Sequence, residues 1–260
     1  IGVNIEGSTQ SVWVSLSVED TEALIKEVPS AYNTKINDVL LTALVQSFAN
    51  WTDSQTLVLA LEGHGRENII ADVDLSRTVG CFTSLFPVLL DLDDVYDLGE
   101  SLKSVKEQLY AIPNRGIGYG LLYYLNQDSE ISKKLRALPQ AEISFNYLGQ
   151  FDQTMPASNS FSLVQNASGP VRSPRGMRRY LIDILGIMSN GQLHFNWIYS
   201  ENLHERSTIE ELAWDFIDAL NALITHCKSE DAGGYTPSDF PEAKLSQNEL
   251  DKFLANFNKG

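Results

Sequence analysis

The alternation of apolar and polar residues predicts several β-strands along the chain. Residues 12–18 alternate, with Val12, Val14 and Leu16 on one side, as in a half-buried strand. Residues 57–61 form a continuous apolar run, Leu-Val-Leu-Ala-Leu, which is typical of a strand buried on both faces. Further strands are expected at residues 83–92, 142–147, 180–188 and 192–199, and Ser189-Asn190-Gly191 predicts a hairpin between the last two.

Helical periodicity appears between these strands. In residues 37–51, five apolar side chains from Leu40 to Phe48 fall on one stripe at near-helical spacing. A helix from Asp20 or Thr21 to Val28, ended by Pro29, is also expected. Other helices are predicted over residues 98–109, from the Ser207-Thr208-Ile209-Glu210 capping box to Cys227, and in a short amphipathic segment at 246–257. The mixture predicts an α/β fold, one mixed β-sheet packed with helices.

Loop-forming stretches suggest how the chain is divided. Pro113 to Gly120 forms a glycine-punctuated loop before an expected helix, and a polar stretch covers residues 153–174. Gly233-Gly234 and Pro237 indicate a linker, so residues 1–229 are predicted to form one lobe and residues 230–260 a linker with a short amphipathic tail. The first residues lack an initiator Met and a signal-peptide pattern, which is typical of a boundary inside a longer polypeptide.

Composition and charge narrow the class of partner. With 34 acidic and 19 basic residues the formal net charge is −15, which disfavours binding to nucleic acid. No apolar run reaches the about 18 residues of a membrane-spanning helix, so no membrane partner is expected. Cys81 and Cys227 are too few and too distant for a metal site or a disulfide framework, and they are typical of reduced thiols in a cytoplasmic protein.

Three common motifs of nucleotide binding or catalysis are absent from the sequence. Gly116, Gly118 and Gly120 do not have the spacing of a dinucleotide-binding loop, and no phosphate-binding Lys follows them as in a P-loop. No Gly-x-Ser-x-Gly sequence occurs, which disfavours a serine hydrolase. The glycines are better interpreted as sites of tight turning or close backbone approach.

Five segments carry distinctive motifs: Asn37-Asp38-Val39-Leu40-Leu41, Glu62-Gly63-His64-Gly65-Arg66-Glu67, Arg77-Thr78-Val79-Gly80 continuing through Phe82-Thr83 to Pro87, Pro113 to Gly120, and Phe145-Asn146-Tyr147-Leu148-Gly149. Together and in this order, they resemble the motifs of epimerization domains of non-ribosomal peptide synthetases. The tail from Tyr235 to Pro241 is similar to the linker that follows such domains.

The resemblance implies a two-lobed fold, of which this sequence matches only the C-terminal lobe. Members of this condensation-domain superfamily have two chloramphenicol-acetyltransferase-like lobes, with a tunnel between them that admits a carrier's phosphopantetheine arm. All the matched segments belong to the C-terminal lobe. The His-His motif of the N-terminal lobe has no counterpart among His64, His194, His204 and His226, and Cys81 replaces the Trp that is usual in the family.

The resemblance also assigns candidate catalytic residues. Glu62 corresponds to the carboxylate that faces the other lobe's histidine across the tunnel; without the motifs it would be interpreted as a solvated acid paired with Arg66. Tyr147 is a second candidate, because a phenol can hydrogen-bond an enolate oxygen. Asn146 is a third candidate, after Tyr147. It alternates with Tyr147 in the strand, so the two should point to opposite faces unless the strand bulges or ends there. Glu67 and His64 are expected to have structural roles.

A further set of residues is expected to line the tunnel for substrate and pantetheine, namely Cys81, Thr83, Gly116, Gly118 and Tyr119. No metal and no directly bound cofactor are implied, because the substrate is carried on the 4′-phosphopantetheine of a peptidyl carrier protein. That carrier protein and the N-terminal lobe of the same synthetase are the partners implied.

The resulting hypothesis is the C-terminal half of an epimerase that inverts the Cα of a carrier-bound aminoacyl or peptidyl thioester from L to D. Half of the catalytic pair is missing, so the chain alone is expected to be inactive or nearly so. A non-catalytic lobe that docks a carrier protein or links modules is the alternative. A condensation domain is a third possibility, which the Glu62 and Phe145 segments disfavour.

Overall fold

The computed structural model describes residues 2–67, 69, 71–93, 95, 97–126, 129–150, 169 and 171–257. The chain divides into two compact units. Unit 1 comprises Ile1–Val18, Val58–Leu89 and Gly116–Ile217, and unit 2 comprises Glu19–Leu57, Leu90–Arg115 and Asp218–Gly260.

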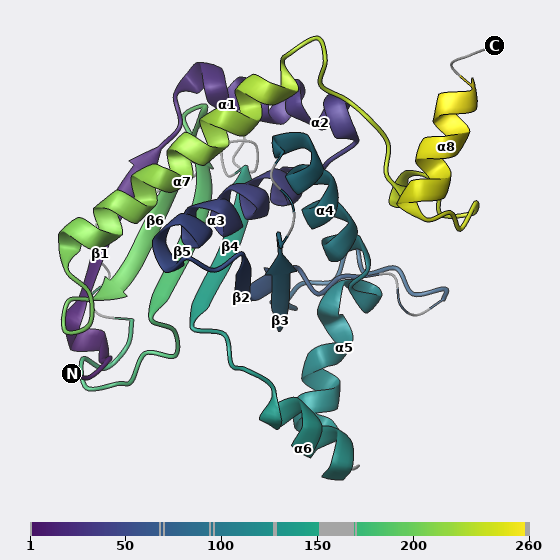
Figure 1. Cartoon of the computed structure of the whole chain (residues 1–260). Helices are drawn as coiled ribbons and strands as arrows, with labels where there is room; N and C mark the ends of the chain where they lie inside the picture. Colours follow the sequence, from purple (N-terminus) through teal and green to yellow (C-terminus); the bar gives the residue numbers. More distant parts are fainter. Residues whose placement is uncertain are drawn as a thin grey trace. The chain divides into compact units, whose positions relative to one another are not determined.

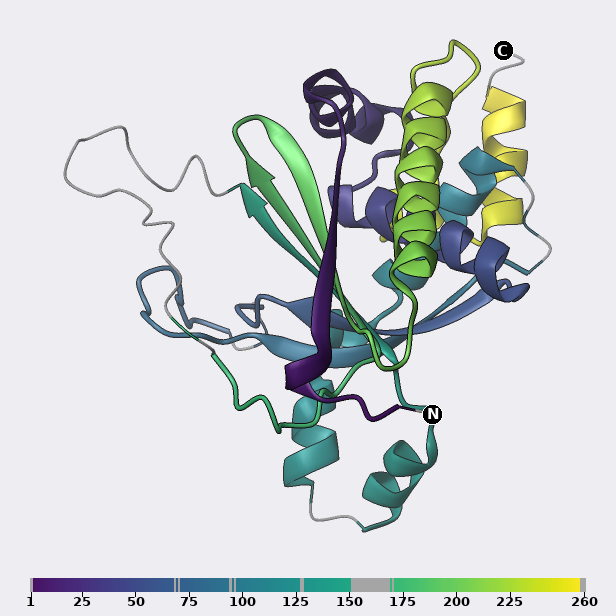
Figure 2. The same cartoon turned by 90° about the vertical axis from the view of Figure 1, so that its left-hand side faces the viewer.

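Unit 1 is built on a six-stranded mixed sheet (Figure 1). Only the first residues of β2 and the last residues of β3 are assigned to unit 2. Its strands lie in the order β1-β6-β5-β4-β2-β3. β4 runs parallel to β2 and β5, whereas β6 is antiparallel to β1 and β5. The twist of the sheet is visible in Figure 2. The strands are β1 (Thr9–Ser15), β2 (Thr56–Gly63), β3 (Ser84–Asp91), β4 (Ile143–Gln150), β5 (Ile182–Ser189) and β6 (Gln192–Ser200).

One face of this sheet forms the core of unit 1. Phe195 and Trp197 of β6 are fully buried and contact Phe216 of α7 (Arg206–Cys227) edge-on, with ring centroids 4.8 and 5.7 Å apart. Aromatic pairs of this kind add about 0.5–1.5 kcal/mol to the burial of their area. The same face carries the buried Phe145 and Ile184, whereas the opposite face carries polar residues such as Ser144, Asn146 and Asp183 together with Leu185 and Ile198.

The β5–β6 hairpin is confirmed. Asn190 and Gly191 connect the strands with φ angles of 51° and 73°. These left-handed conformations are the ones that a two-residue Asn-Gly turn requires.

Most predicted boundaries differ from the structure by a few residues, and three of the differences are informative. β1 ends at Ser15 rather than residue 18, because Val18 already begins α1 (Val18–Lys26). Pro29 does not end a helix: it lies in the first turn of α2 (Val28–Tyr32), where its missing N–H costs no helical hydrogen bond. The helix predicted from Ser207 starts one residue earlier, at Arg206.

The glycine-rich segment of unit 1 is more helical than expected. After η2 (Pro113–Gly116), the chain forms α5 (Ile117–Gly120), the π-type turn η3 (Leu121–Leu125) and α6 (Ser129–Ala137), a helix that the pattern did not predict.

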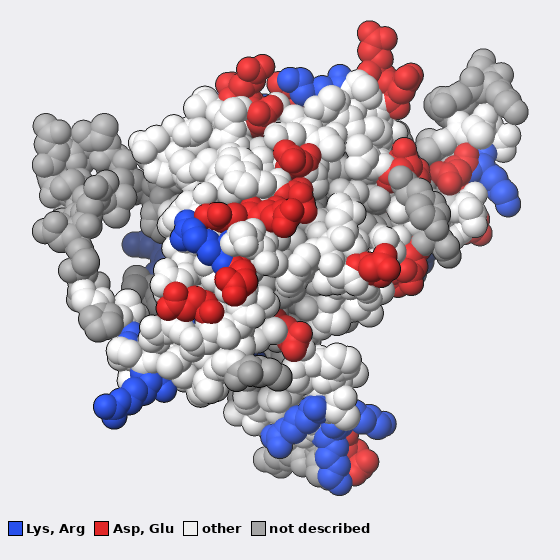
Figure 3. Space-filling model, turned by 60° about the vertical axis from the view of Figure 1, so that its left-hand side comes forward, with Lys and Arg blue, Asp and Glu red and all other residues white. Residues whose placement is uncertain are grey.

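Acidic side chains outnumber basic ones on the face in Figure 3, and Lys and Arg gather at its lower end, where α6 lies.

Unit 2 is helical. α3 (Ile36–Thr52) has a buried apolar stripe from Val39 to Phe48, and the backbone N–H of Lys35 donates to Asp38 at its start. α4 (Leu98–Tyr110) is capped by Asp97 and contacts α2, α3 and η4 (Pro237–Asp239). The unit also contains most of α1, the second half of α7, and α8 (Gln247–Phe257).

Three expectations from the sequence concern membrane-spanning helices, metal sites and the polar stretch at residues 153–174. Among the helices described here, none is both long enough and apolar enough to cross a membrane. Within the same residues, no group of three or more His, Cys, Asp or Glu side chains could hold a metal ion. Most of the predicted polar stretch at residues 153–174 lies outside the described residues.

Candidate functional site

The strand register of unit 1 gathers polar side chains on the sheet face opposite the core. Leu61 pairs with Phe145, so the next residues, Glu62 and Asn146, share the other face. Ser144 pairs with Asp183 across β4 and β5 and lies on that same face. Three neighbouring strands therefore bring together two carboxylates, a carboxamide and a hydroxyl.

Glu62 is held by Asn146. The Asn146 Nδ2 amide donates to Glu62 Oε2 at 2.6 Å, which leaves Oε1 available for another partner. Burial is the main reason why the pKa of Glu62 lies above its ordinary value; the negative charge of Asp183 raises the pKa further, and the hydrogen bond from Asn146 lowers it. The structure thus brings together two of the three predicted catalytic residues.

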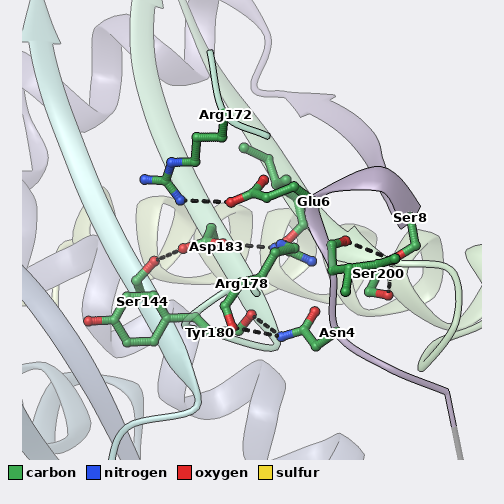
Figure 4. A network of polar contacts seen from close by, with 11 residues as sticks. Asn4, Glu6, Ser8, Ser144, Arg172, Arg178, Tyr180, Asp183 and Ser200 are labelled. Atoms are coloured by element: carbon green, nitrogen blue, oxygen red, sulfur yellow. Dashed lines mark hydrogen bonds and ion pairs between the residues drawn. The ribbon is translucent and has the colours of Figure 1, made fainter. Parts of the chain in front are cut away.

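Asp183 belongs to a second polar network, which is shown in Figure 4. Its Oδ1 accepts from Ser144 Oγ at 2.5 Å and its Oδ2 from Arg178 Nη2 at 2.8 Å. Arg178 also donates to the carbonyl of Ile198 at 2.8 Å, and only 3% of its side chain is exposed, against 35% for Asp183. This ion pair holds the Asp183 carboxylate, whose charge raises the pKa of Glu62, a feature that the sequence did not identify.

Tyr180 is a second residue that sequence reasoning missed. Its hydroxyl is buried, and among the described residues it has no hydrogen-bond partner. Burial raises the pKa of Tyr180, as do the nearby carboxylates of Asp183 and Glu62, so the phenol stays protonated. Figure 4 shows its ring directed toward Ser144. The only available signal was the Arg178-Arg179-Tyr180 sequence, which ends on the first residue of the strand predicted at residues 180–188.

The N-terminal segment is tied to the same network. Asn4 Nδ2 donates to the carbonyl of Tyr180 at 2.9 Å, and Arg172 pairs with Glu6 at 2.9 Å (Figure 4). The hydroxyls of Ser8 and Ser200 lie 2.7 Å apart and are buried. These contacts anchor the chain ahead of β1 next to the residues that hold Asp183.

The loop after β2 is held by Arg66. Its guanidinium donates to the carbonyls of Leu75 and Gly80, both at 3.0 Å, and lies 4.6 Å from the centre of the Phe82 ring. Gly65 has a φ of 65°, and a Cβ there would overlap the Phe82 carbonyl. The loop can therefore close only with glycine at this position.

His64 and Glu67 take part in the same loop. His64 Nε2 lies 3.1 Å from Glu67 Oε1, and His64 Nδ1 accepts from the backbone N–H of Arg66 at 3.0 Å. These contacts agree with the structural roles expected for both residues.

Tyr147 lies away from Glu62 in the regular part of β4. It pairs with Gly186, and the ideal Cβ position of Gly186 is 3.3 Å from the Tyr147 ring. Gly186 also pairs with the buried Phe195, so Tyr147 faces the core side of the sheet. Burial raises the pKa of Tyr147. The register therefore favours Asn146 over Tyr147 as the partner of Glu62; a catalytic role for Tyr147 stays a prediction.

Cys81 and Thr83 contact each other. The Cys81 Sγ lies 3.4 Å from Thr83 Oγ1, and this hydrogen bond lowers the pKa of the exposed Cys81 thiol. The negative charge of Glu62 opposes that shift, which places Cys81 within electrostatic reach of Glu62. Both predicted tunnel residues belong to the stretch between β2 and β3, and their place in a tunnel stays a prediction.

The other predicted tunnel residues, Gly116, Gly118 and Tyr119, lie in different surroundings. Gly116 has a φ of 77° and lies directly against the Phe86 ring, so it is a position of close approach. Gly118 is helical, and its Cβ position faces open space. Tyr119 stacks on Tyr123, with ring centroids 5.6 Å apart. Burial raises the pKa of Tyr119; Tyr124 raises it further and Arg179 lowers it, and the same two residues act on the pKa of Tyr180. No hydrogen bond links Gly116, Gly118 or Tyr119 to Glu62 within the part of the chain that is described.

This geometry supports proton transfer. A half-buried carboxylate with a raised pKa is a better proton acceptor than an exposed one, and it returns the proton more readily than a stronger base would. Asn146 fixes the orientation of the carboxylate, which is the usual requirement for a positioned base.

Comparison with known proteins agrees with the fold. A family model described as "Condensation domain" matches residues 4–246. The chain is 50% identical over 251 residues to a linear gramicidin synthase polypeptide of Brevibacillus parabrevis and 40% identical over 250 residues to surfactin synthase subunit 1 of Bacillus subtilis. Both alignments cover 96% of this chain, but only 3% of the gramicidin synthase polypeptide and 7% of the surfactin synthase subunit.

A solved structure matches as well. The epimerization domain from the third module of tyrocidine synthetase B is 37% identical, with a TM-score of 0.79 over 87% of this chain and 50% of that one. A four-domain non-ribosomal peptide synthetase, 18% identical with a TM-score of 0.63, shares the fold. The chain thus spans about half the length of the solved epimerization domain. With the family model covering most of its length, this chain belongs to the condensation-domain family of non-ribosomal peptide synthetases.

Proposed function

We propose that this chain is the C-terminal lobe of an epimerization domain and that Glu62 transfers the Cα proton of a carrier-bound aminoacyl or peptidyl thioester. The carboxylate of Glu62, raised in pKa by burial and oriented by Asn146, is the observation that carries the proposal. The Glu62 to Glu67 motif and the similarity to a solved epimerization domain support it.

The chemistry needs a positioned carboxylate. The Cα of a thioester is only weakly acidic, so its proton leaves when a base lies within hydrogen-bonding distance and the developing enolate is stabilised. Removal of the proton gives a planar enolate and a protonated Glu62. Inversion is complete when a proton reaches the opposite face of Cα, and the histidine of the N-terminal lobe is the donor that the family resemblance implies.

The substrate arrives on a partner. In the proposal, a peptidyl carrier protein delivers it on the 4′-phosphopantetheine arm, and the N-terminal lobe of the same synthetase completes the tunnel. Asn146 acts by holding one oxygen of Glu62, so that the other meets the substrate.

Stereochemical analysis tests this function. A domain containing this lobe and the N-terminal lobe is incubated with an L-aminoacyl or L-peptidyl thioester on a carrier protein, and the released acid is separated by chiral chromatography. We expect D-product from the complete domain and almost none from the 260-residue chain alone. A complete domain that forms a peptide bond and leaves the stereochemistry unchanged would establish the condensation alternative instead. A domain that does neither but binds carrier protein would establish the docking alternative.

A further inference from the structure

The segment after α7 carries a sequence motif that the proposed function does not use. Tyr235-Thr236-Pro237-Ser238-Asp239-Phe240 follows Gly233-Gly234 and has the composition of a linker. In unit 2 it is ordered against α2 and α4. The Thr236 side chain is fully buried, which is unusual for a polar residue in a linker.

The centre of this contact is a buried ion pair. Lys106 Nζ lies 2.7 Å from Asp239 Oδ1, and 7% and 11% of the two side chains are exposed. The Lys106 ammonium also donates to the carbonyl of Tyr32 at 2.8 Å. A lysine ammonium is strongly hydrated in water, so a buried one requires such partners.

Asp239 has two roles at once. Its Oδ2 accepts from the backbone N–H of Thr236 at 2.8 Å and so closes the η4 turn, while its Oδ1 faces Lys106. The turn is therefore formed by the same carboxylate that recognises unit 2. A neutral Asn at this position would retain the cap but lose the charge.

Three further contacts surround the pair. The backbone N–H of Ser238 donates to Glu107 Oε1 at 3.1 Å, and that of Gly234 donates to the carbonyl of Ala31 at 3.1 Å. Tyr235 lies beside Phe240, with ring centroids 5.5 Å apart. The segment thus meets both α2 and α4 through backbone as well as side-chain groups.

We propose that the surface formed by α2 and α4 is a specific binding site for the Thr236–Asp239 turn, with residues 234–240 docking on unit 2 as a peptide ligand and the Lys106–Asp239 pair as its anchor. The docked segment fixes the position from which the chain continues toward α8. The boundary between lobe and linker then lies beyond residue 240 rather than at residue 229.

A cleavable full-length chain tests the site. A protease recognition sequence inserted in the exposed turn Ser229–Ala232 separates the segment from α7 after folding, and native mass spectrometry with dilution measures how tightly the released fragment is held. We expect the fragment to stay bound. Loss of one partner of a buried ion pair should weaken retention about 100-fold or more in Asp239→Asn.

Glu242→Gln is the matched control, because Glu242 is exposed, follows the turn and loses the same charge. It should retain the fragment like the parent. Lys106→Met should act like Asp239→Asn, and its thermal unfolding before cleavage checks that it folds. Equal retention in Asp239→Asn and Glu242→Gln would overturn the proposal, and so would release of the fragment from the parent.

Hydrogen exchange in the uncut chain gives a second readout. The backbone amides of Ser238 and Gly234, which donate to Glu107 and Ala31, should exchange faster in Asp239→Asn than in Glu242→Gln, because loss of the Lys106 ion pair loosens the docked turn while its own cap is retained. Unchanged exchange would contradict the anchoring role. None of these measurements depends on catalysis, so they stand whether or not Glu62 is a proton-transfer residue.

Discussion

The hydrogen bond from Asn146 to Glu62 allows a quantitative test of the site. Replacing Asn146 by Leu, which has nearly the same shape, removes the amide donor while continuing to exclude water. Because the bond favours the ionised form of Glu62, its loss should raise the pKa of Glu62 further.

The size of this rise follows from the geometry. At 2.6 Å the bond is short and, when Glu62 is ionised, charge-assisted. Hydrogen bonds to charged groups contribute about 1.5–3 kcal/mol, and solvent screening at a half-buried carboxylate reduces the value to roughly 1 kcal/mol. Loss of the bond should therefore disfavour the ionised form of Glu62 by roughly 1 kcal/mol, which raises the pKa of Glu62 above that of the wild type.

Carboxyl carbon NMR of glutamate-labelled chain measures this pKa directly, with Glu62→Gln identifying the signal. Asn196→Leu is a matched control, because Asn196 pairs with Leu185, which pairs with Asn146, and so lies on the same face two strands away. It should leave Glu62 nearly unchanged. An unchanged or lower pKa in Asn146→Leu would refute the reasoning, as would a wild-type Glu62 that titrates at or below the ordinary value for glutamate.

The raised pKa of Glu62 also has a consequence for stability. The folded chain holds the Glu62 proton more tightly than the unfolded chain, so the contribution to stability is present below the unfolded pKa and is lost as pH rises through the folded pKa. Glu62→Gln should therefore unfold at a slightly higher temperature than the wild type at pH 7, and the difference should vanish near pH 4. A lower unfolding temperature at pH 7 would contradict this sign.

Three other substitutions probe the surroundings of the site. Asp183→Asn leaves the buried Arg178 without its charge partner and should lower the free energy of unfolding by about 2–3 kcal/mol in urea titrations, whereas Glu6→Gln, whose partner Arg172 is exposed, should cost less than about 1 kcal/mol. Gly65→Ala should destabilise the chain by about 1–3 kcal/mol in thermal unfolding, because its Cβ overlaps a carbonyl, while Gly118→Ala in open helical space should not. Iodoacetamide should modify Cys81 well before the buried Cys227, whose pKa is raised to about 11, and Thr83→Val should slow the modification of Cys81; equal rates by mass spectrometry would contradict this.

Much of the fold could be predicted because its signals are local. The apolar run at residues 57–61 and the Asn190-Gly191 turn each specify their element without help from distant residues. The beginning of α2 could not be predicted, because Pro29 is equally compatible with the end of one helix and the first turn of another.

The site depended on register, which local patterns do not supply. Glu62 could be chosen from its motif, but its partner is decided by the pairing of β2 with β4, about 80 residues apart in the chain. The alternation of Asn146 and Tyr147 correctly indicated that only one of them could face Glu62, without indicating which. No sequence motif marks Asp183 or Tyr180. Their positions near the site follow from the pairing of β5 with β4 and β6, which local patterns do not give.

Deuterium exchange at Cα tests the central claim most directly. A complete domain containing this lobe is given a carrier-bound thioester in deuterated water, and deuterium incorporation is followed by mass spectrometry. We expect Glu62→Gln to abolish exchange at Cα and Glu67→Gln, which alters the neighbouring His64 contact, to retain most of it. Exchange at an undiminished rate in Glu62→Gln would remove Glu62 from the mechanism.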